Sequence, residues 1–166
     1  MTTLAPQETL GRYQLLDELG RGAQATVWRA RDPQLQREVA LKIWHGPGDD
    51  DAAGGLIAEA RLAAGLRHAG IVPLFDVLQD KGRLVTVAEC VAGPTLAEHL
   101  QRHGALPPRD AVHLAQALLD ALAHAHGQGV VHRDLKASNV LLGDEDRKST
   151  RLNSSHEWIS RMPSSA

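Results

Sequence analysis

Apolar and polar positions alternate in short runs over the first ninety residues, which is the pattern of half-buried β-strands. Glycine, proline or aspartate bounds most of these runs, as expected where strands end in turns. We therefore predict five strands: Tyr13–Leu19, Thr26–Arg31, Glu38–Ile43, Ile71–Leu78 and Leu84–Glu89. The last two are predicted to form a hairpin around Asp80–Gly82. Consecutive short strands of this kind predict an antiparallel sheet.

Helical spacing of apolar positions replaces the alternation elsewhere in the chain. One helix is predicted from about Leu56 to Leu66, between the third and fourth strands. Thr95 and Glu98 form the pattern of a capping box, which predicts a second, short helix ending at Gly104. Apolar residues recur every three or four positions over 109–126, which predicts a longer amphipathic helix.

One apolar pair and one apolar triplet near residue 135 are predicted to be short buried strands. They are Val130–Val131 and Val140–Leu142, which bracket a polar segment. The five strands and the first helix would form one part of the molecule, and the later helices another.

The sequence changes character from Asp146 onward. This segment has almost no apolar residues and no helical or strand period, so one interpretation is a disordered tail. The other is that residues 146–166 are the translation of a widely used short-read sequencing adapter, because translating that adapter in one reading frame gives almost all of these residues. On this hypothesis the chain divides into an N-terminal extension (1–12), two native parts (13–92 and 93–145) and a non-native tail (146–166).

The composition of the chain limits the classes of binding partner to be expected. The formal net charge is −2 and no dense basic block is present, so neither nucleic acid nor an anionic membrane is expected as a partner. The single Cys90 excludes an intramolecular disulfide, and we see no apolar run of signal or membrane-spanning length. A reducing, cytoplasmic environment is therefore expected, and the sequence leaves the oligomeric state open.

Residues 132–139 read His-Arg-Asp-Leu-Lys-Ala-Ser-Asn and match the pattern H-R-D-x-x-x-x-N. In that pattern the aspartate accepts the proton of a substrate hydroxyl during phosphoryl transfer, and the asparagine ligates a metal ion. An ordinary polar turn is the alternative interpretation. Eight aligned positions favour the catalytic one.

Residues 20–27 read Gly-Arg-Gly-Ala-Gln-Ala-Thr-Val and fit the phosphate-covering loop G-x-G-x-x-G-x-V, with Ala25 in place of the third glycine. A positive φ at Ala25 would be strained, so the conformation of the loop is open. The segment also fits the dinucleotide fingerprint G-x-G-x-x-A, but that motif opens a helix, whereas a strand is predicted here. A plain hairpin turn is a further alternative.

The tetrapeptide Val39–Lys42 lies between these two motifs in the order that protein kinases require. Over residues 13–142 the chain therefore resembles a bacterial eukaryotic-type (Hanks-type) serine/threonine protein kinase. The resemblance implies an α+β, protein-kinase-like fold, with a five-stranded antiparallel N-lobe sheet plus one helix, followed by a mainly helical C-lobe. The family places an Asp-Phe-Gly segment shortly after the position of Asn139. Because this sequence has none, we expect a truncated C-lobe and an inactive fragment.

The resemblance also implies roles for individual residues. Asp134 would be the catalytic base, Lys136 a clamp on the transferred group, and Asn139 a magnesium ligand. Lys42 would pair with the phosphates of ATP and be held by Glu59. The expected ATP contacts are Gly20, Arg21, Gly22, Ala23, Val27, Ala40, Lys42, Glu89 and Val91. His132 is expected to be a packed structural residue. The expected cofactors are ATP and Mg²⁺, with the second metal-binding aspartate absent from this sequence.

The function expected of the parent protein is transfer of the ATP γ-phosphate to Ser/Thr hydroxyls of proteins. The first alternative is a non-catalytic nucleotide-binding or scaffolding remnant. The second is a small-molecule phosphotransferase of the same fold, against which Arg133 and Lys136 argue.

Overall fold

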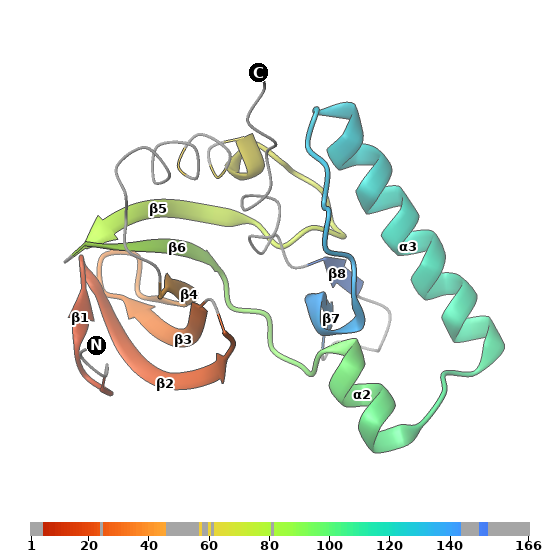
Figure 1. The fold of residues 1–166 in the computed structure, drawn as a ribbon, viewed down its shortest axis with the longest axis horizontal. Helices are drawn as coiled ribbons and strands as arrows, with labels where there is room; N and C mark the ends of the chain where they lie inside the picture. Colours follow the sequence, from red (N-terminus) through yellow and green to blue (C-terminus); the bar gives the residue numbers. More distant parts are fainter. Residues whose placement is uncertain are drawn as a thin grey trace. The chain divides into compact units, whose positions relative to one another are not determined.

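A computed structural model describes residues 5–23, 25–45, 57, 60, 62–80, 82–143 and 150–152 of the protein. The chain divides into two compact units. The first consists of the described residues of Met1–Arg61 together with Leu74–Cys90, and the second of Leu62–Pro73 with the described residues of Val91–Ala166. Figure 1 shows the sheet of the first unit and the helices of the second.

The first unit is built on one antiparallel sheet in the order β1-β2-β3-β4-β6-β5. Its strands are β1 (Thr9–Leu10), β2 (Tyr13–Arg21), β3 (Ala25–Asp32), β4 (Arg37–Trp44), β5 (Leu74–Asp80) and β6 (Arg83–Glu89). The antiparallel sheet is confirmed, but it has six strands rather than five. In the predicted first helix, the described residues 57, 60 and 62–64 are helical.

The additional strand is β1, which lies in the segment predicted to be an N-terminal extension. Leu10 is fully buried and pairs with Tyr13, so the chain reverses through Gly11, whose φ is +54°. Two residues are too few to show an alternating pattern, which is why the sequence did not reveal this strand.

The β5 strand begins at Leu74 rather than at the predicted Ile71. Ile71 and Val72 instead belong to the second unit. There Ile71 forms a parallel bridge with Leu152, and the Val72 amide donates to the Leu152 carbonyl over 2.9 Å. Pairing with a distant segment thus decides the start of β5, and local alternation cannot show it.

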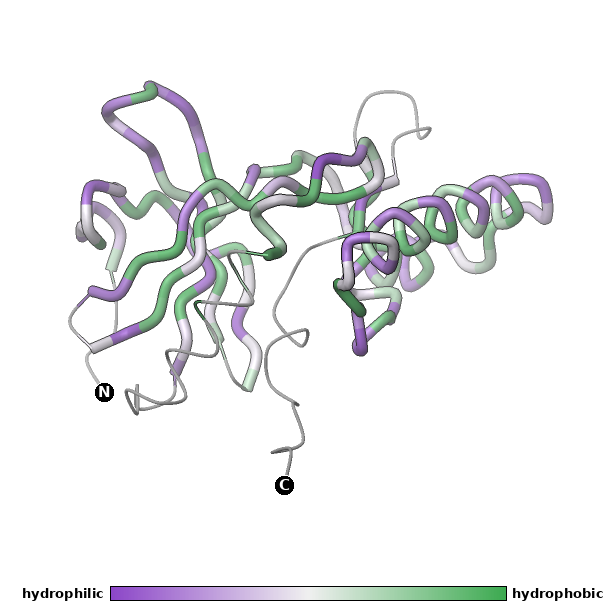
Figure 2. Tube along the Cα trace, turned by 90° about the horizontal axis from the view of Figure 1, so that it is seen from above, coloured by the Kyte–Doolittle hydropathy of each residue, from purple (hydrophilic) through white to green (hydrophobic). Residues whose placement is uncertain are grey.

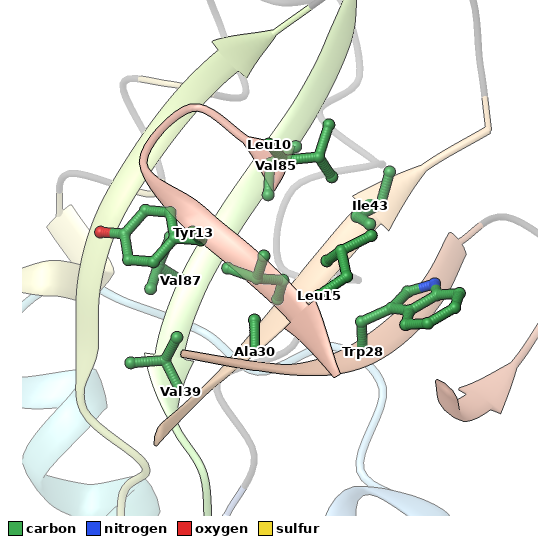
Figure 3. Packing of buried hydrophobic residues seen from close by; sticks show 10 residues of the cluster. Leu10, Tyr13, Leu15, Trp28, Ala30, Val39, Ile43, Val85 and Val87 are labelled. Atoms are coloured by element: carbon green, nitrogen blue, oxygen red, sulfur yellow. The ribbon is translucent and has the colours of Figure 1, made fainter. Parts of the chain in front are cut away.

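One face of the sheet forms the core of the first unit (Figure 3). In β4 the residues Val39, Leu41 and Ile43 are buried, so Ala40 and Lys42 lie on the other face. The core residues are Leu10, Tyr13, Leu15, Trp28, Ala30, Val39, Leu41, Ile43, Val85 and Val87. Each large side chain among them contributes about 1.5–3 kcal/mol through burial. The core therefore fixes which residues of each strand face away from it.

The second unit contains α2 (Leu96–His103), α3 (Pro108–Gly127), the short 3₁₀ helix η1 (Ala137–Asn139) and a hairpin of β7 (Val140–Leu142) with β8 (Thr150–Leu152). The predicted capping box of α2 is present. The Thr95 hydroxyl accepts from the Glu98 amide over 3.2 Å, and the Glu98 carboxylate accepts from the Thr95 amide over 2.9 Å. Gly104 ends the helix with φ +79°.

The predicted amphipathic helix is α3, on which polar and apolar residues alternate around the coil (Figure 2). Ala121 and Ala125 are buried, whereas Val112 and Leu119 are exposed. The core of this unit is Leu66, Ile71, Ala121, Ala125, Val130, Val140 and Leu152. Among the helices described, none is long and apolar enough to span a membrane.

Two expectations about the second unit are wrong. Val130–Val131 is not a strand: Val130 packs in the core, but Val131 is half exposed and the segment makes no ladder. Conversely, Thr150–Leu152 forms β8 although no strand was predicted after residue 145. β8 is held by Leu141↔Arg151 and the flanking pairs with β7, together with one buried side chain, Leu152. A three-residue strand of this kind has no period to read.

Candidate active site

The glycine-rich segment is a hairpin between β2 and β3. Gly20 pairs with Val27 and Arg21 with Thr26, and the Gly22 amide donates to the Ala25 carbonyl over 2.9 Å. Ala25 starts β3 and is not among the described residues with positive φ, so alanine fits where the pattern has its third glycine. Because a strand and not a helix follows, the dinucleotide-binding interpretation is excluded.

The exposed flank of the hairpin carries an ion pair. The Arg21 guanidinium lies 2.6 Å from the Glu18 carboxylate and lowers the pKa of Glu18 through that hydrogen bond. Ala23, another expected ATP contact, is exposed at the turn. The expected loop residues thus stand together at one end of the sheet.

Cross-strand register places Val27, Ala40 and Lys42 on one face of the sheet, whereas Glu89, opposite Val39, falls on the core side. Residues directly opposite in adjacent strands project to the same side. Val27 of β3 is opposite Lys42 of β4, which is opposite Thr86 of β6. Ala40, two residues before Lys42, therefore shares this face, away from the core. The Lys42 Nζ lies 4.8 Å from the centre of the Trp44 ring.

Thr86 is a residue of this face that the sequence alone did not single out. Its identity as the cross-strand partner of Lys42 depends on the register of β4 with β6, which becomes visible only when the strands are paired. Glu59 lies outside the described residues, so its ion pair with Lys42 stays a prediction.

The segment expected to contact adenine follows the end of β6. Glu89 is the last residue of that strand and pairs with Val39; Cys90 belongs to the first unit and Val91 to the second. Burial, followed by the nearby carboxylate of Glu38, raises the pKa of the Cys90 thiol. The thiol is therefore a poor nucleophile at neutral pH.

In the second unit, the expected catalytic residues meet around one carboxylate. The Lys136 ammonium lies 2.5 Å from Asp134 Oδ2. Asn139 Nδ2 donates to the same oxygen over 2.7 Å and to the Asp134 main-chain carbonyl over 2.9 Å. Three of the predicted residues are thus brought together within one short loop.

The backbone of this loop bends sharply before the aspartate. Arg133 has φ +53°, and the Asp134 amide donates to the His132 carbonyl. His132 is 2% exposed, which confirms the expectation that it is a packed residue. Burial of His132 on one side and η1 on the other fix the direction in which Asp134 emerges.

Asn139 is suited to bind a hard cation with its amide oxygen. Both hydrogen bonds to Asp134 use the amide nitrogen, so Oδ1 is the atom left for a metal, and magnesium prefers such oxygen ligands. Within the part of the chain that the structure describes, no group of three or more His, Cys, Asp or Glu residues could hold a metal by itself. Any magnesium here would need ligands from the nucleotide or from other residues.

Comparison with known proteins identifies the family of this chain. The family model of the protein kinase domain matches residues 13–153. The chain belongs to the protein kinase family.

Among its relatives are bacterial serine/threonine-protein kinases. PrkC of Bacillus subtilis is 37% identical over 134 residues, which cover 80% of this chain and 21% of that protein. PknL of Mycobacterium tuberculosis is 35% identical over 136 residues, covering 81% of this chain and 34% of PknL. The chain therefore spans only about a fifth to a third of the length of these two relatives.

Solved structures share the fold. The PknI kinase domain of Mycobacterium tuberculosis matches with a TM-score of 0.83 at 28% identity, covering 97% of this chain and 64% of that one. A structure of Rad53 in complex with AMP-PNP matches with a TM-score of 0.78 at 27% identity, covering 86% of this chain and 38% of that one. The kinase-like fold class is thereby confirmed.

Proposed function

We propose that this chain carries the phosphate-binding and catalytic-loop parts of a serine/threonine protein kinase that transfers the γ-phosphate of ATP to protein hydroxyls. The observation that carries the proposal is the cluster of Asp134, Lys136 and Asn139, in which one carboxylate is held by an ammonium and an amide. Serine/threonine specificity is supported by the relatives, which are serine/threonine-protein kinases, and by Lys136, two positions after the aspartate.

The first unit supplies groups suited to a nucleotide triphosphate. The hairpin over 20–27 offers backbone amides beside residues with small or no side chains, and Lys42 adds a positive charge on the same face as Val27. Ala40 offers a small apolar surface on that face. The nucleotide analogue bound to Rad53, which shares this fold, supports ATP as the ligand.

The second unit supplies the transfer chemistry. In the proposed step, the substrate hydroxyl oxygen forms a bond to the γ-phosphorus as the bond to the β–γ bridging oxygen breaks, and ADP leaves with that electron pair. Asp134 accepts the hydroxyl proton. Lys136 offsets negative charge on the transferred group, a role suited to its ammonium beside Asp134.

Magnesium, when bound, would neutralise charge on the phosphate oxygens. Asn139 is the described residue suited to hold it, through Oδ1. Its orientation by Asp134 would keep that oxygen in one direction.

The test has two parts. Isothermal titration of the 166-residue chain with magnesium and ATP should show saturable binding, and Lys42→Met should weaken it at least tenfold, whereas Asp134→Asn should not. In the full-length parent protein, Asp134→Asn should cut transfer of labelled γ-phosphate to a serine peptide by orders of magnitude. Failure of the wild-type chain to bind ATP, or near-normal transfer by the Asp134→Asn parent, would contradict the proposal.

The same assay addresses the alternative of a non-catalytic remnant. A remnant would bind ATP in the first assay, and the wild-type parent would transfer no phosphate in the second. A tyrosine peptide serves as the substrate control, because the proposal expects serine and threonine hydroxyls to be preferred.

A further inference from the structure

His45 connects the end of β4 to the glycine-rich hairpin, a contact that the proposed function does not use. Its Nε2 lies 2.6 Å from Thr26 Oγ1, and its Nδ1 lies 3.3 Å from the carbonyl oxygen of Ala23. Both partners lie within the hairpin over 20–27, Ala23 at its turn and Thr26 in β3. His45 itself follows β4, three residues after Lys42.

The chemistry of the partners defines which nitrogen carries the proton. A carbonyl oxygen only accepts, so Nδ1 must carry hydrogen to bond with Ala23. In the neutral ring Nε2 is then an acceptor, and the Thr26 hydroxyl donates to it. One imidazole therefore satisfies two groups of the hairpin at the same time.

The Thr26 end of this contact is firmly anchored. Thr26 is 4% exposed and pairs with Ile43 of β4 and Arg21 of β2. The Ala23 end is the exposed turn. His45 thus joins the exposed turn of the hairpin, at Ala23, to the buried Thr26 of the sheet through a single rigid ring.

We propose that His45 is a positioning residue that holds the glycine-rich hairpin in the conformation that receives the nucleotide phosphates. This inference rests on the proposed function, because it assigns the hairpin to phosphates. It makes His45, the residue directly after β4, a determinant of nucleotide affinity outside the glycine motif.

The expected effect follows from pre-organisation. A loop already held in its bound conformation loses less freedom on binding, so its ligand binds more tightly. A neutral hydrogen bond contributes about 0.5–1.5 kcal/mol, which corresponds to about a two- to tenfold change in an equilibrium constant. Breaking the contact should open the turn and weaken ATP binding by about that factor.

Two variants break the contact at different ends. Thr26→Val removes the hydroxyl at nearly constant volume, and His45→Phe keeps a ring but removes both nitrogens. Thr26→Ser keeps the hydroxyl and should restore wild-type behaviour. His113→Phe, a change at an exposed histidine of α3, is the matched control.

Three measurements are made on the 166-residue chain. Amide exchange at Gly22 and its neighbours reports opening of the hairpin. Nitrogen chemical shifts of the His45 ring, assigned by their absence in His45→Phe, report whether Nδ1 carries the proton. Titration of the chain with ATP and magnesium gives the Kd. We expect faster exchange in both contact variants, with a two- to tenfold higher Kd in Thr26→Val, which loses one hydrogen bond, and at least as large an increase in His45→Phe, which loses two. Thr26→Ser and His113→Phe should match the wild type.

The outcomes separate the two proposals. Unchanged exchange in both contact variants would overturn the role of His45 in holding the hairpin. Faster exchange with an unchanged Kd would show that the contact does not position the hairpin for phosphate, and would overturn the inference while leaving the proposed function intact. A wild-type chain that binds no ATP would overturn the proposed function, whatever the exchange data show.

Discussion

Leu152 offers the most direct test of how the second unit is held together. Its side chain is 2% exposed and packs in the same core as Ile71 and Val140. Its backbone is held by two segments: its amide donates to Gly70 over 2.7 Å and its carbonyl accepts from Val72 over 2.9 Å, and on the β7 side it pairs with Val140. Leu152→Ala would therefore leave a cavity that the backbone cannot move in to fill.

The cost can be worked from this environment. Buried Leu→Ala changes cost about 2–5 kcal/mol, the larger values belonging to sites that do not collapse. With the backbone of Leu152 held by two segments, we expect at least about 3 kcal/mol, a large share of the roughly 5–15 kcal/mol that stabilises a typical domain. The control is Leu119→Ala, at an exposed position of α3, which should change stability by less than about 0.5 kcal/mol.

Urea unfolding measures the difference with two probes. Far-ultraviolet circular dichroism follows mainly α2 and α3 of the second unit, and two of the three tryptophans, Trp28 and Trp44, report the sheet of the first. The dichroism midpoint of Leu152→Ala should fall well below that of Leu119→Ala, or its helical signal should be absent without urea. If the two variants unfold at the same urea concentration, β8 is not part of the core and the reasoning is wrong.

Three further predictions concern individual interactions. Thr95→Ala should lower stability by about 1 kcal/mol in a thermal melt because it removes the N-cap, and Thr95→Ser should restore it. Burial opposes ionisation of Asp32, but two backbone amides of the following turn and a guanidinium hold its pKa below 3.8. The stability that ionised Asp32 adds is therefore present above that pH and is lost on further acidification. When the stability of Asp32→Asn is measured at falling pH, it should lack that loss. Burial and then the charge of Asp76 raise the pKa of Tyr13 to about 12, so the chain's single tyrosine should ionise near pH 12 when folded and near 10 in urea, as followed by phenolate absorbance. The stability contributed by neutral Tyr13 is full below about pH 10 and falls as the pH approaches 12; ionisation near pH 10 in the folded chain would contradict the burial argument.

The elements that the sequence predicted well are those whose pattern is local. The strand predicted at Glu38–Ile43 is β4, Arg37–Trp44, because three buried residues alternate with three partly exposed ones. The capping box, a motif of only four residues from Thr95 to Glu98, similarly identified the start of α2. β1 and β8 were missed because each is held by a partner strand, and two or three residues carry no readable period.

The origin of residues 146–166 remains a hypothesis that sequencing the source DNA across codon 145 tests. β8 does not decide it, since a short segment with one apolar residue can pair with β7 whatever its source. If the codons differ in the source DNA, a different segment would have to supply the side chain that Leu152 places in the core.

In the candidate site, too, contacts between residues close in sequence were predicted and contacts between distant residues were not. Asp134, Lys136 and Asn139 lie within six residues, so a motif alone predicted that they meet. The contact of His45 with Thr26 spans nineteen residues and depends on the register of β3 with β4, so no motif contains it. The same holds for Thr86 opposite Lys42.

The geometry of the catalytic loop argues that its charged residues are not there for packing. The described η1 helix contributes no buried residue, and the Lys136 side chain is half exposed. Holding a lysine against a carboxylate costs side-chain entropy of about 1.5–2 kcal/mol, and partly exposed ion pairs return only about 0–1 kcal/mol. The fold gains little from this arrangement, whereas phosphoryl transfer requires a base and a cation at fixed positions. That difference favours the catalytic interpretation of this loop over a scaffolding one.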